Sequence, residues 1–154
     1  MENLESDRIV VGVDGSESSV AALRYAARMS VALGVALEAV TSWGAPPMYY
    51  AGGEWYPEQD AQDALDDAVK EAFGATPPAR LTRSVIPGSP AHTLIEMSRS
   101  CGMLVVGSRG RGGFMGLLLG SVSAACARHA HCPVLIVRAQ PADAEAVSSD
   151  RQDS

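Results

Sequence analysis

Short apolar runs alternate with amphipathic helical periods along most of this chain, and this alternation is the feature that most restricts its fold. The runs expected to form strands are residues 9–13, 35–41, 80–86, 103–106 and 134–137. The helices expected between them are residues 16–33, 58–73, 89–100 and 121–129. Strands that alternate with helices imply a parallel sheet covered on both faces. The pattern therefore predicts an α/β fold: a single-domain, open, twisted, mainly parallel five-stranded sheet with helices on both faces, of the Rossmann-like type.

One domain is expected, because the 154 residues suit a single compact unit and no internal repeat is visible. We expect residues 1–8 to be an N-terminal extension and residues 9–139 to be the domain. Residues 140–154 are polar and acidic without a period, which favours a disordered tail. Residues 43–56 are rich in proline, glycine and aromatic residues, and we expect a long loop that serves as a lid or packs on its own domain.

The charge balance argues against several kinds of partner. With a net charge of -6 and 19% charged residues, the chain lacks the basic character of a general nucleic-acid or membrane-surface binder. No apolar run is long enough to span a bilayer and no signal peptide is expected, so we expect a cytoplasmic protein. The three cysteines, Cys101, Cys126 and Cys132, match no zinc spacing. Buried, reduced thiols are the favoured interpretation of them, and redox sensing is the alternative.

Residues 107–121 carry the strongest chemical signal, since six of these fifteen residues are glycine and the segment lies between the most apolar strand and a helix. Glycine-dense turns let backbone N–H groups approach an anion without clashes from Cβ atoms. The helix expected to begin at Gly120-Ser121 would add free N–H groups and the positive end of its dipole. Arg109 and Arg111 would add positive charge. Each feature alone is compatible with a solvated loop, but their combination predicts a phosphate site.

Two familiar phosphate-binding patterns are absent from the sequence. No Gly-Lys-Ser or Gly-Lys-Thr follows the glycines, as a P-loop would require. The dinucleotide fingerprint belongs in the first strand–helix turn, which here is only Asp14-Gly15-Ser16. In parallel α/β sheets, ligands bind beyond the carboxyl ends of the strands, where the strand order reverses. The loops that begin at Asp14, Ser42 and Gly107 are therefore expected to meet at the site.

The spacing of Gly107, Gly110 and Gly120-Ser121, with two and nine intervening residues, resembles the nucleotide motif of the universal stress protein family. The resemblance extends over nearly the whole domain. Residues 11–16 are similar to that family's first strand and turn, and residues 106–110 to its fourth strand and loop. Residues 129–135, the sequence His-Ala-His-Cys-Pro-Val-Leu, are similar to its closing segment.

The resemblance implies an adenine nucleotide α-hydrolase-like fold and an ATP site, with Mg²⁺ accompanying the phosphates. The nucleotide-binding residues that it implies are Asp14, Gly15, Ser16, Val40, Val106, Gly107, Arg109, Gly110, Gly120, Ser121, Val122 and Ser123. Asp14 is expected near the adenosine and Val40 against adenine through its backbone. Gly107, Arg109 and Gly110 are expected to flank the ribose and phosphates. The resemblance also implies a homodimer through the last strand, Val134 to Val137, which would otherwise be an apolar edge strand.

The functional hypothesis is a nucleotide-dependent stress-response regulator that hydrolyses ATP slowly at most. We assign no catalytic residue and no protein metal site, because none of the three histidines lies in the glycine segment and Asp14 is a single carboxylate. Three alternatives stay open: a weak ATPase or autophosphorylating enzyme, a cyclic-AMP-binding member of the same fold, and a scaffold with a vestigial site. A downstream protein partner is expected, and its identity is not specified by the sequence.

Overall fold

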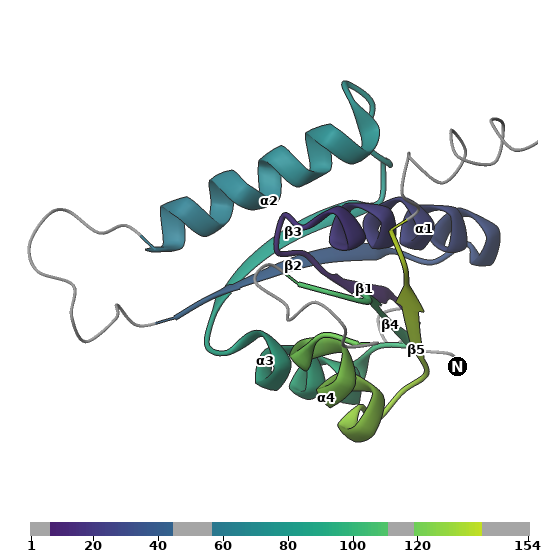
Figure 1. The fold of residues 1–154 in the computed structure, drawn as a ribbon. Helices are drawn as coiled ribbons and strands as arrows, with labels where there is room; N and C mark the ends of the chain where they lie inside the picture. The colour runs from purple at the N-terminus through teal and green to yellow at the C-terminus, as the bar shows by residue number, and fades with distance from the viewer. Residues whose placement is uncertain (1–6, 45–56, 111–118, 140–154) are drawn as a thin grey trace, which may run out of the picture.

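The computed structural model describes residues 7–44, 57–110 and 119–139. Its elements are β1 (Ile9–Gly12), α1 (Glu17–Leu33), β2 (Leu37–Trp43), α2 (Pro57–Phe73), β3 (Leu81–Pro87), α3 (Pro90–Met97), the 3₁₀ turn η1 (Ser98–Ser100), β4 (Met103–Gly107), α4 (Ser121–His129) and β5 (Val134–Val137). The strands form one parallel sheet in the order β3-β2-β1-β4-β5 (Figure 1). The predicted parallel α/β fold with five strands is confirmed. The predicted lid at residues 43–56 and the tail at residues 140–154 lie almost entirely outside the described residues.

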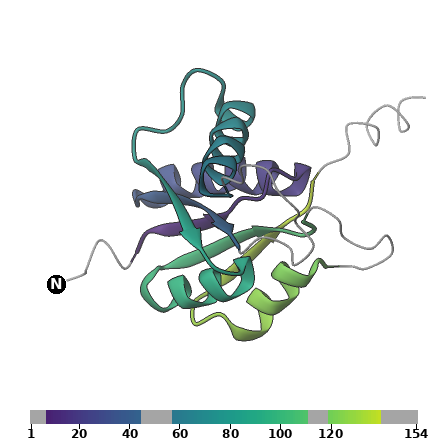
Figure 2. The same cartoon turned by 90° about the vertical axis from the view of Figure 1, so that its left-hand side faces the viewer.

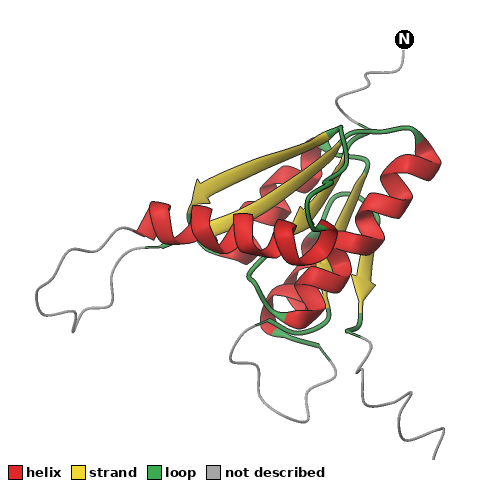
Figure 3. Cartoon of the chain, turned by 90° about the horizontal axis from the view of Figure 1, so that it is seen from above, coloured by secondary structure: helices red, strands yellow, loops and turns green. Residues whose placement is uncertain are grey.

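The helices form two layers, one on each face of the sheet. Helices α1 and α2 cover one face and α3 and α4 cover the other (Figure 1), and the view turned by 90° keeps the sheet between them (Figure 2). Seen from above in Figure 3, α1 and α2 lie in front of the strands. The chain steps from β1 to β2 and β3 on one side, and then crosses to β4 and β5 on the other. The strand order therefore reverses between β1 and β4, where a doubly wound sheet places its ligand.

Serine caps and glycine stops set the helix ends much as the sequence predicts. The Ser16 hydroxyl accepts a hydrogen bond from the backbone N–H of Ser19 at 3.3 Å and caps α1. That helix ends at Gly34, whose φ of 68° is the left-handed conformation that glycine adopts without strain. Ser89 caps α3 in the same way, with Pro90 in the first turn.

Strand β1 lies at the centre of two hydrophobic clusters. Ile9 and Val11 face the cluster beneath α1 and α2, whereas Val10 faces the cluster beneath α3 and α4. Both faces of the strand are therefore covered, which explains why its sequence is a continuous apolar run rather than an alternating one. Among the described residues, no helix is long and apolar enough to cross a membrane.

Element boundaries differ from the predicted ones by a few residues. Strand β2 begins at Leu37 rather than at residue 35, because Val35 is still in the turn, where its N–H bonds to the Ser30 carbonyl at 3.1 Å. The predicted helix over 89–100 ends at Met97, and its last turn tightens into η1. Edge strand β3 is only partly buried, so its apolar pattern is weak and its predicted start was one residue early.

The first turn of α1 packs directly on the end of β4. A Cβ atom added to Gly107 would lie 2.6 Å from the carbonyl carbon of Ser18 and 2.8 Å from the backbone nitrogen of Ser19. Both neighbours are backbone atoms of a helix, so neither can move aside without shifting the helix. The absence of a side chain at Gly107 is therefore a condition for this helix–strand contact.

We expect Gly107→Ala to destabilise the fold by roughly 1–3 kcal/mol, because overpacking a well-packed contact costs about this much. Urea unfolding followed by far-UV circular dichroism measures the change. Gly44→Ala is the matched control, since a Cβ atom at Gly44 would meet no atom within 4 Å. Equal stability of the two variants would contradict this account of the contact.

Candidate functional site

A cavity of about 400 Å³ lies at the carboxyl ends of β1, β2 and β4, at the reversal of strand order. It extends toward the amino-terminal turns of α2, α3 and α4. The described residues that line it are Gly12, Val13, Asp14, Ser16, Ser19, Val40, Thr41, Ser42, Trp43, Gly44, Pro57, Asp60, Ala61, Ala64, Pro90, Leu94, Val106, Gly107, Arg109, Gly110, Val122 and Ser123. The loops that begin after β1, β2 and β4 thus meet there, as expected from the topology.

Most of the residues predicted for the site line this cavity. They are Asp14, Ser16, Val40, Val106, Gly107, Arg109, Gly110, Val122 and Ser123. Gly15, Gly120 and Ser121 are not among the lining residues; Gly15 and Ser121 adjoin lining residues in the sequence, and Gly120 packs against Gly110, which lines the cavity. Arg111 and the other glycine-segment residues 111–118 lie outside the described residues.

The turn after β1 fixes the carboxylate of Asp14. Its Oδ1 accepts hydrogen bonds from both the backbone N–H, at 2.9 Å, and the hydroxyl of Ser16. Gly15 between them has a φ of 83°, a conformation that favours glycine. The other carboxylate oxygen faces the loop after β4, since a Cβ atom added to Gly110 would lie 2.7 Å from Asp14 Oδ2. Asp14 and Gly110 therefore bring the two central loops into contact.

Hydrogen bonds hold both ends of the glycine segment. The Ser18 hydroxyl accepts from the backbone N–H of Arg109 at 3.2 Å and donates to the Arg109 carbonyl. The carbonyl of Ser108 accepts from the N–H of Gly120 at 2.7 Å and from the hydroxyl of Ser123 at 3.0 Å. The first residues of the segment are therefore held against α1, and its last residues are held at the start of α4.

Two of the glycines are required by the packing of the chain itself, which was not predicted from the sequence. A Cβ atom on Gly120 would lie 3.2 Å from the backbone nitrogen of Gly110 and 3.3 Å from the Cα atom of Arg109. Gly107 is likewise packed against the backbone of α1. In the sequence analysis, the many glycines are explained by the close approach of a ligand. At Gly107 and Gly120, however, contact with the backbone of another part of the chain already requires glycine.

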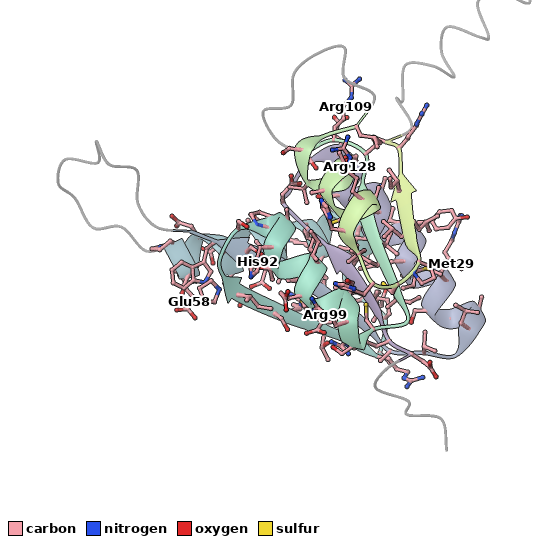
Figure 4. All side chains as sticks on the ribbon, turned by 90° about the horizontal axis from the view of Figure 1, so that it is seen from below. Met29, Glu58, His92, Arg99, Arg109 and Arg128 are labelled. Atoms are coloured by element: carbon pink, nitrogen blue, oxygen red, sulfur yellow. The ribbon has the colours of Figure 1, made fainter. Side chains whose placement is uncertain are left out.

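The amino end of α4 differs from those of α1 and α3. Its N-cap is Gly120, which has no side chain to cap the first turn, whereas serine hydroxyls cap the other two helices. The first turn of a helix carries N–H groups without intrahelical partners and the positive end of the helix dipole. Val122 and Ser123 of that turn line the cavity, and Arg109 lies at the same end of the molecule (Figure 4). This part of the cavity suits an anion.

Much of the rest of the cavity lining is apolar. Val40, Ala61, Leu94 and Val106 contribute apolar side chains from four different elements. Trp43 adds an indole ring, whose Nε1 is buried and has no hydrogen-bond partner among the described residues.

Sequence reasoning named Val40 and the loop that begins at Ser42, but it missed Thr41 of β2 and all of the lining residues of α2 and α3. Thr41 could have been found, because it lies near the carboxyl end of the strand next to β1, at the ligand edge. Asp60 and Ala64 of α2, and Leu94 of α3, gave no signal, because ordinary helix residues at those positions look the same whether they line a cavity or a core.

Metal-binding and acid–base groups are sparse in the cavity. Asp14 and Asp60 both line it, but among the described residues no three histidine, cysteine or acidic side chains cluster closely enough to hold a metal ion. The histidines of the described chain, His92, His129 and His131, are not lining residues. His92 lies on α3, apart from Arg109 (Figure 4).

The sequence model of the universal stress protein family matches residues 5–138. A universal stress protein from Mycobacterium tuberculosis is 35% identical over 141 residues, covering 84% of this chain and 46% of that protein. The chain thus spans about half the length of the curated relatives it matches.

Solved structures share the fold. Universal stress protein UspA from Lactobacillus plantarum has a TM-score of 0.65 at 22% identity, covering 88% of this chain and 100% of that one. A universal stress protein in complex with cAMP has a TM-score of 0.57 at 32% identity, covering 87% of this chain and 98% of that one. The family match over residues 5–138 shows that the chain belongs to the universal stress protein family.

Proposed function

We propose that this chain is a nucleotide-dependent stress-response regulator that binds ATP, with Mg²⁺ on its phosphates, in the cavity between β1 and β4. The observation that carries the proposal is the division of that cavity into two parts. The amino end of α4 and Arg109 follow β4, whereas Val40 and Trp43 come from β2, on the other side of β1. The cAMP complex of a relative at 32% identity supports an adenine nucleotide as the ligand class.

The phosphates would lie against the amino end of α4. Backbone N–H groups there and the helix dipole stabilise negative charge, and Arg109 adds a guanidinium. The protein as a whole is negatively charged, at -6, so this local positive potential has to offset the general repulsion of a polyanion. Phosphates held by Mg²⁺ carry less charge, and Mg²⁺ commonly binds through one or two carboxylates plus phosphate oxygens. Asp14 and Asp60 fit that role.

The adenine ring would occupy the apolar part of the cavity. Val40 and Leu94 offer apolar surface to its faces, and Trp43 also lines the cavity. The Val40 carbonyl already accepts from the N–H of Val13 at 2.8 Å, which fixes the backbone that adenine would meet.

Hydrolysis would be slow at most. None of the histidines in the described chain lines the cavity, and Oδ1 of Asp14 already accepts two hydrogen bonds from Ser16. This favours a role in which ATP binding, not turnover, is the signal. Free cysteines at all three positions fit the reducing cytoplasm that we propose as its location.

Calorimetric titration of nucleotide-stripped protein with ATP and Mg²⁺ tests the proposal. We expect Gly110→Val to weaken binding by about tenfold or more, because its Cβ atom alone would lie 2.7 Å from Asp14 Oδ2 and the added methyl groups would fill the cavity. Arg109→Gln should also weaken binding by about tenfold, the usual contribution of a charge-assisted hydrogen bond.

Arg99→Gln is the matched control for Arg109→Gln. Arg99 is an exposed arginine of η1 at the opposite end of the molecule, paired only loosely with Glu96 at 3.5 Å (Figure 4). Circular dichroism confirms that each variant is folded. If Gly110→Val binds ATP as tightly as the wild type, or if the two arginine variants lose the same affinity, the nucleotide does not bind in this cavity.

A cyclic-AMP binder on the same fold is the second candidate, and the cAMP complex of the 32% identical relative favours it. Displacement calorimetry separates the two. We expect ATP to displace cAMP and to bind more tightly, because three phosphates engage more of the α4 N–H groups than a single cyclic phosphate does. Tighter binding of cAMP than of ATP would establish the second candidate.

The proposal includes a homodimer through β5. This strand ends the sheet as an apolar, half-buried edge, and beside it runs a groove lined by Tyr25 of α1 and by Leu135 and Val137 of β5. Exposed apolar edges promote pairing with another chain. We expect sedimentation velocity to show a dimer that Leu135→Lys dissociates and that Leu33→Lys, at an exposed position outside the groove, leaves intact. A monomeric wild type would contradict this part.

A further inference from the structure

Two thiols lie side by side at the end of the sheet opposite the cavity. The Sγ atoms of Cys101 and Cys132 are 3.7 Å apart, although the residues are 31 positions apart in sequence. Cys101 precedes β4 and Cys132 precedes β5, so both lie at the amino ends of neighbouring parallel strands. All three cysteines are free thiols in the structure.

The backbone around Cys132 holds the two thiols together independently of the sulfur atoms. On one side, the backbone N–H of His131 donates to the buried Ser98 hydroxyl at 2.9 Å, which ties the turn before β5 to η1. On the other side, the N–H of Leu104 donates to the Pro133 carbonyl at 2.9 Å. Cys132 lies between these two anchors. A disulfide of about 2.0 Å therefore needs only a small movement of the two side chains.

The two thiols differ in access to solvent. Cys101 is 8% exposed, and burial, followed by the nearby Cys132, raises the pKa of its thiol to about 12. Cys132 is partly exposed. The third cysteine, Cys126, is fully buried on α4, and burial raises its thiol pKa to about 11. An oxidant from solvent therefore reaches Cys132 first, because reactivity follows thiolate character and exposure.

We propose that Cys101 and Cys132 form a redox-active dithiol that peroxide oxidises to an intramolecular disulfide. The Cys132 sulfur attacks a peroxide oxygen, and the O–O bond breaks to give a sulfenic acid and water. The Cys101 sulfur then attacks the Cys132 sulfur, and the hydroxyl leaves as a second water with the proton of Cys101. The two thiols lose two electrons in total, and hydrogen peroxide is reduced to two waters.

The disulfide would join the start of β4 to the start of β5. The covalent loop would contain β4, the glycine segment and α4, which together carry Gly110, Val122 and Ser123 of the cavity lining. Because the bond forms at the amino ends of the strands and the cavity lies at their carboxyl ends, it would stiffen these elements without blocking the cavity. The proposal does not depend on which ligand the cavity binds.

Treatment of the reduced protein with hydrogen peroxide, followed by peptide mapping under non-reducing conditions, tests the proposal. We expect a peptide pair linked through Cys101 and Cys132, a mass loss of about two hydrogens, and a fall from three titratable thiols to one after unfolding. Dithiothreitol should restore all three, and the oxidised form should unfold at a higher temperature because the link constrains the unfolded chain.

Cys126→Ala is the matched control and should still form the link, whereas Cys132→Ser should leave both remaining cysteines as free thiols at the same peroxide dose. Cys132→Ser changes a partly exposed side chain, so the folded state is expected to persist and is checked by circular dichroism. Oxidation of Cys132 to sulfinic acid without a link, a Cys126–Cys132 link, or an intermolecular disulfide as the main product would overturn the proposal.

Discussion

The packing of the first turn of α1 against the end of β4 is the contact on which the arrangement of the cavity depends. Gly107 allows the backbones of the two elements to touch, and the Ser18 hydroxyl then bonds to both backbone groups of Arg109. The same helix end is capped by Ser16, which also holds Asp14. One close approach therefore sets the positions of the two loops that meet where the strand order reverses. Any substitution that separates α1 from β4 would move both loops.

The fold could be predicted from the sequence because its signals are local. The central strand β1 is apolar throughout because helices cover both of its faces, and Ser16, Gly34 and Ser89 mark helix ends by their own backbone preferences. The predicted start of β2 was two residues early because Val35 is apolar although it lies in a turn. The predicted start of β3 was one residue early because this edge strand is only partly buried and its apolar pattern is weak. A charged residue inside β2, Glu38, is explained only by its distant partners, Arg8 at 2.9 Å and Ser84 at 2.8 Å.

The candidate site was predicted on the side of β1 and β4 and missed on the side of α2 and α3. Glycines at set distances and a short Asp-Gly-Ser turn are recognisable because few residues can replace them. The wall formed by Ala61, Ala64 and Leu94 has no such signature, since its members would look alike in any helix packed on a sheet. The thiol pair was missed for a related reason. Cys101 and Cys132 are 31 positions apart, and only the pairing of β4 with β5 brings them together.

The account places an adenine nucleotide between the amino end of α4 and the indole of Trp43, and nuclear magnetic resonance of the ¹⁵N-labelled protein tests this placement most directly. On addition of ATP and Mg²⁺, the account predicts the largest shifts at the backbone amides of Gly110, Val122 and Ser123 and at the indole N–H of Trp43, a residue that lines the cavity. Shifts confined to the groove between α1 and β5, or no shifts at millimolar ATP, would contradict it.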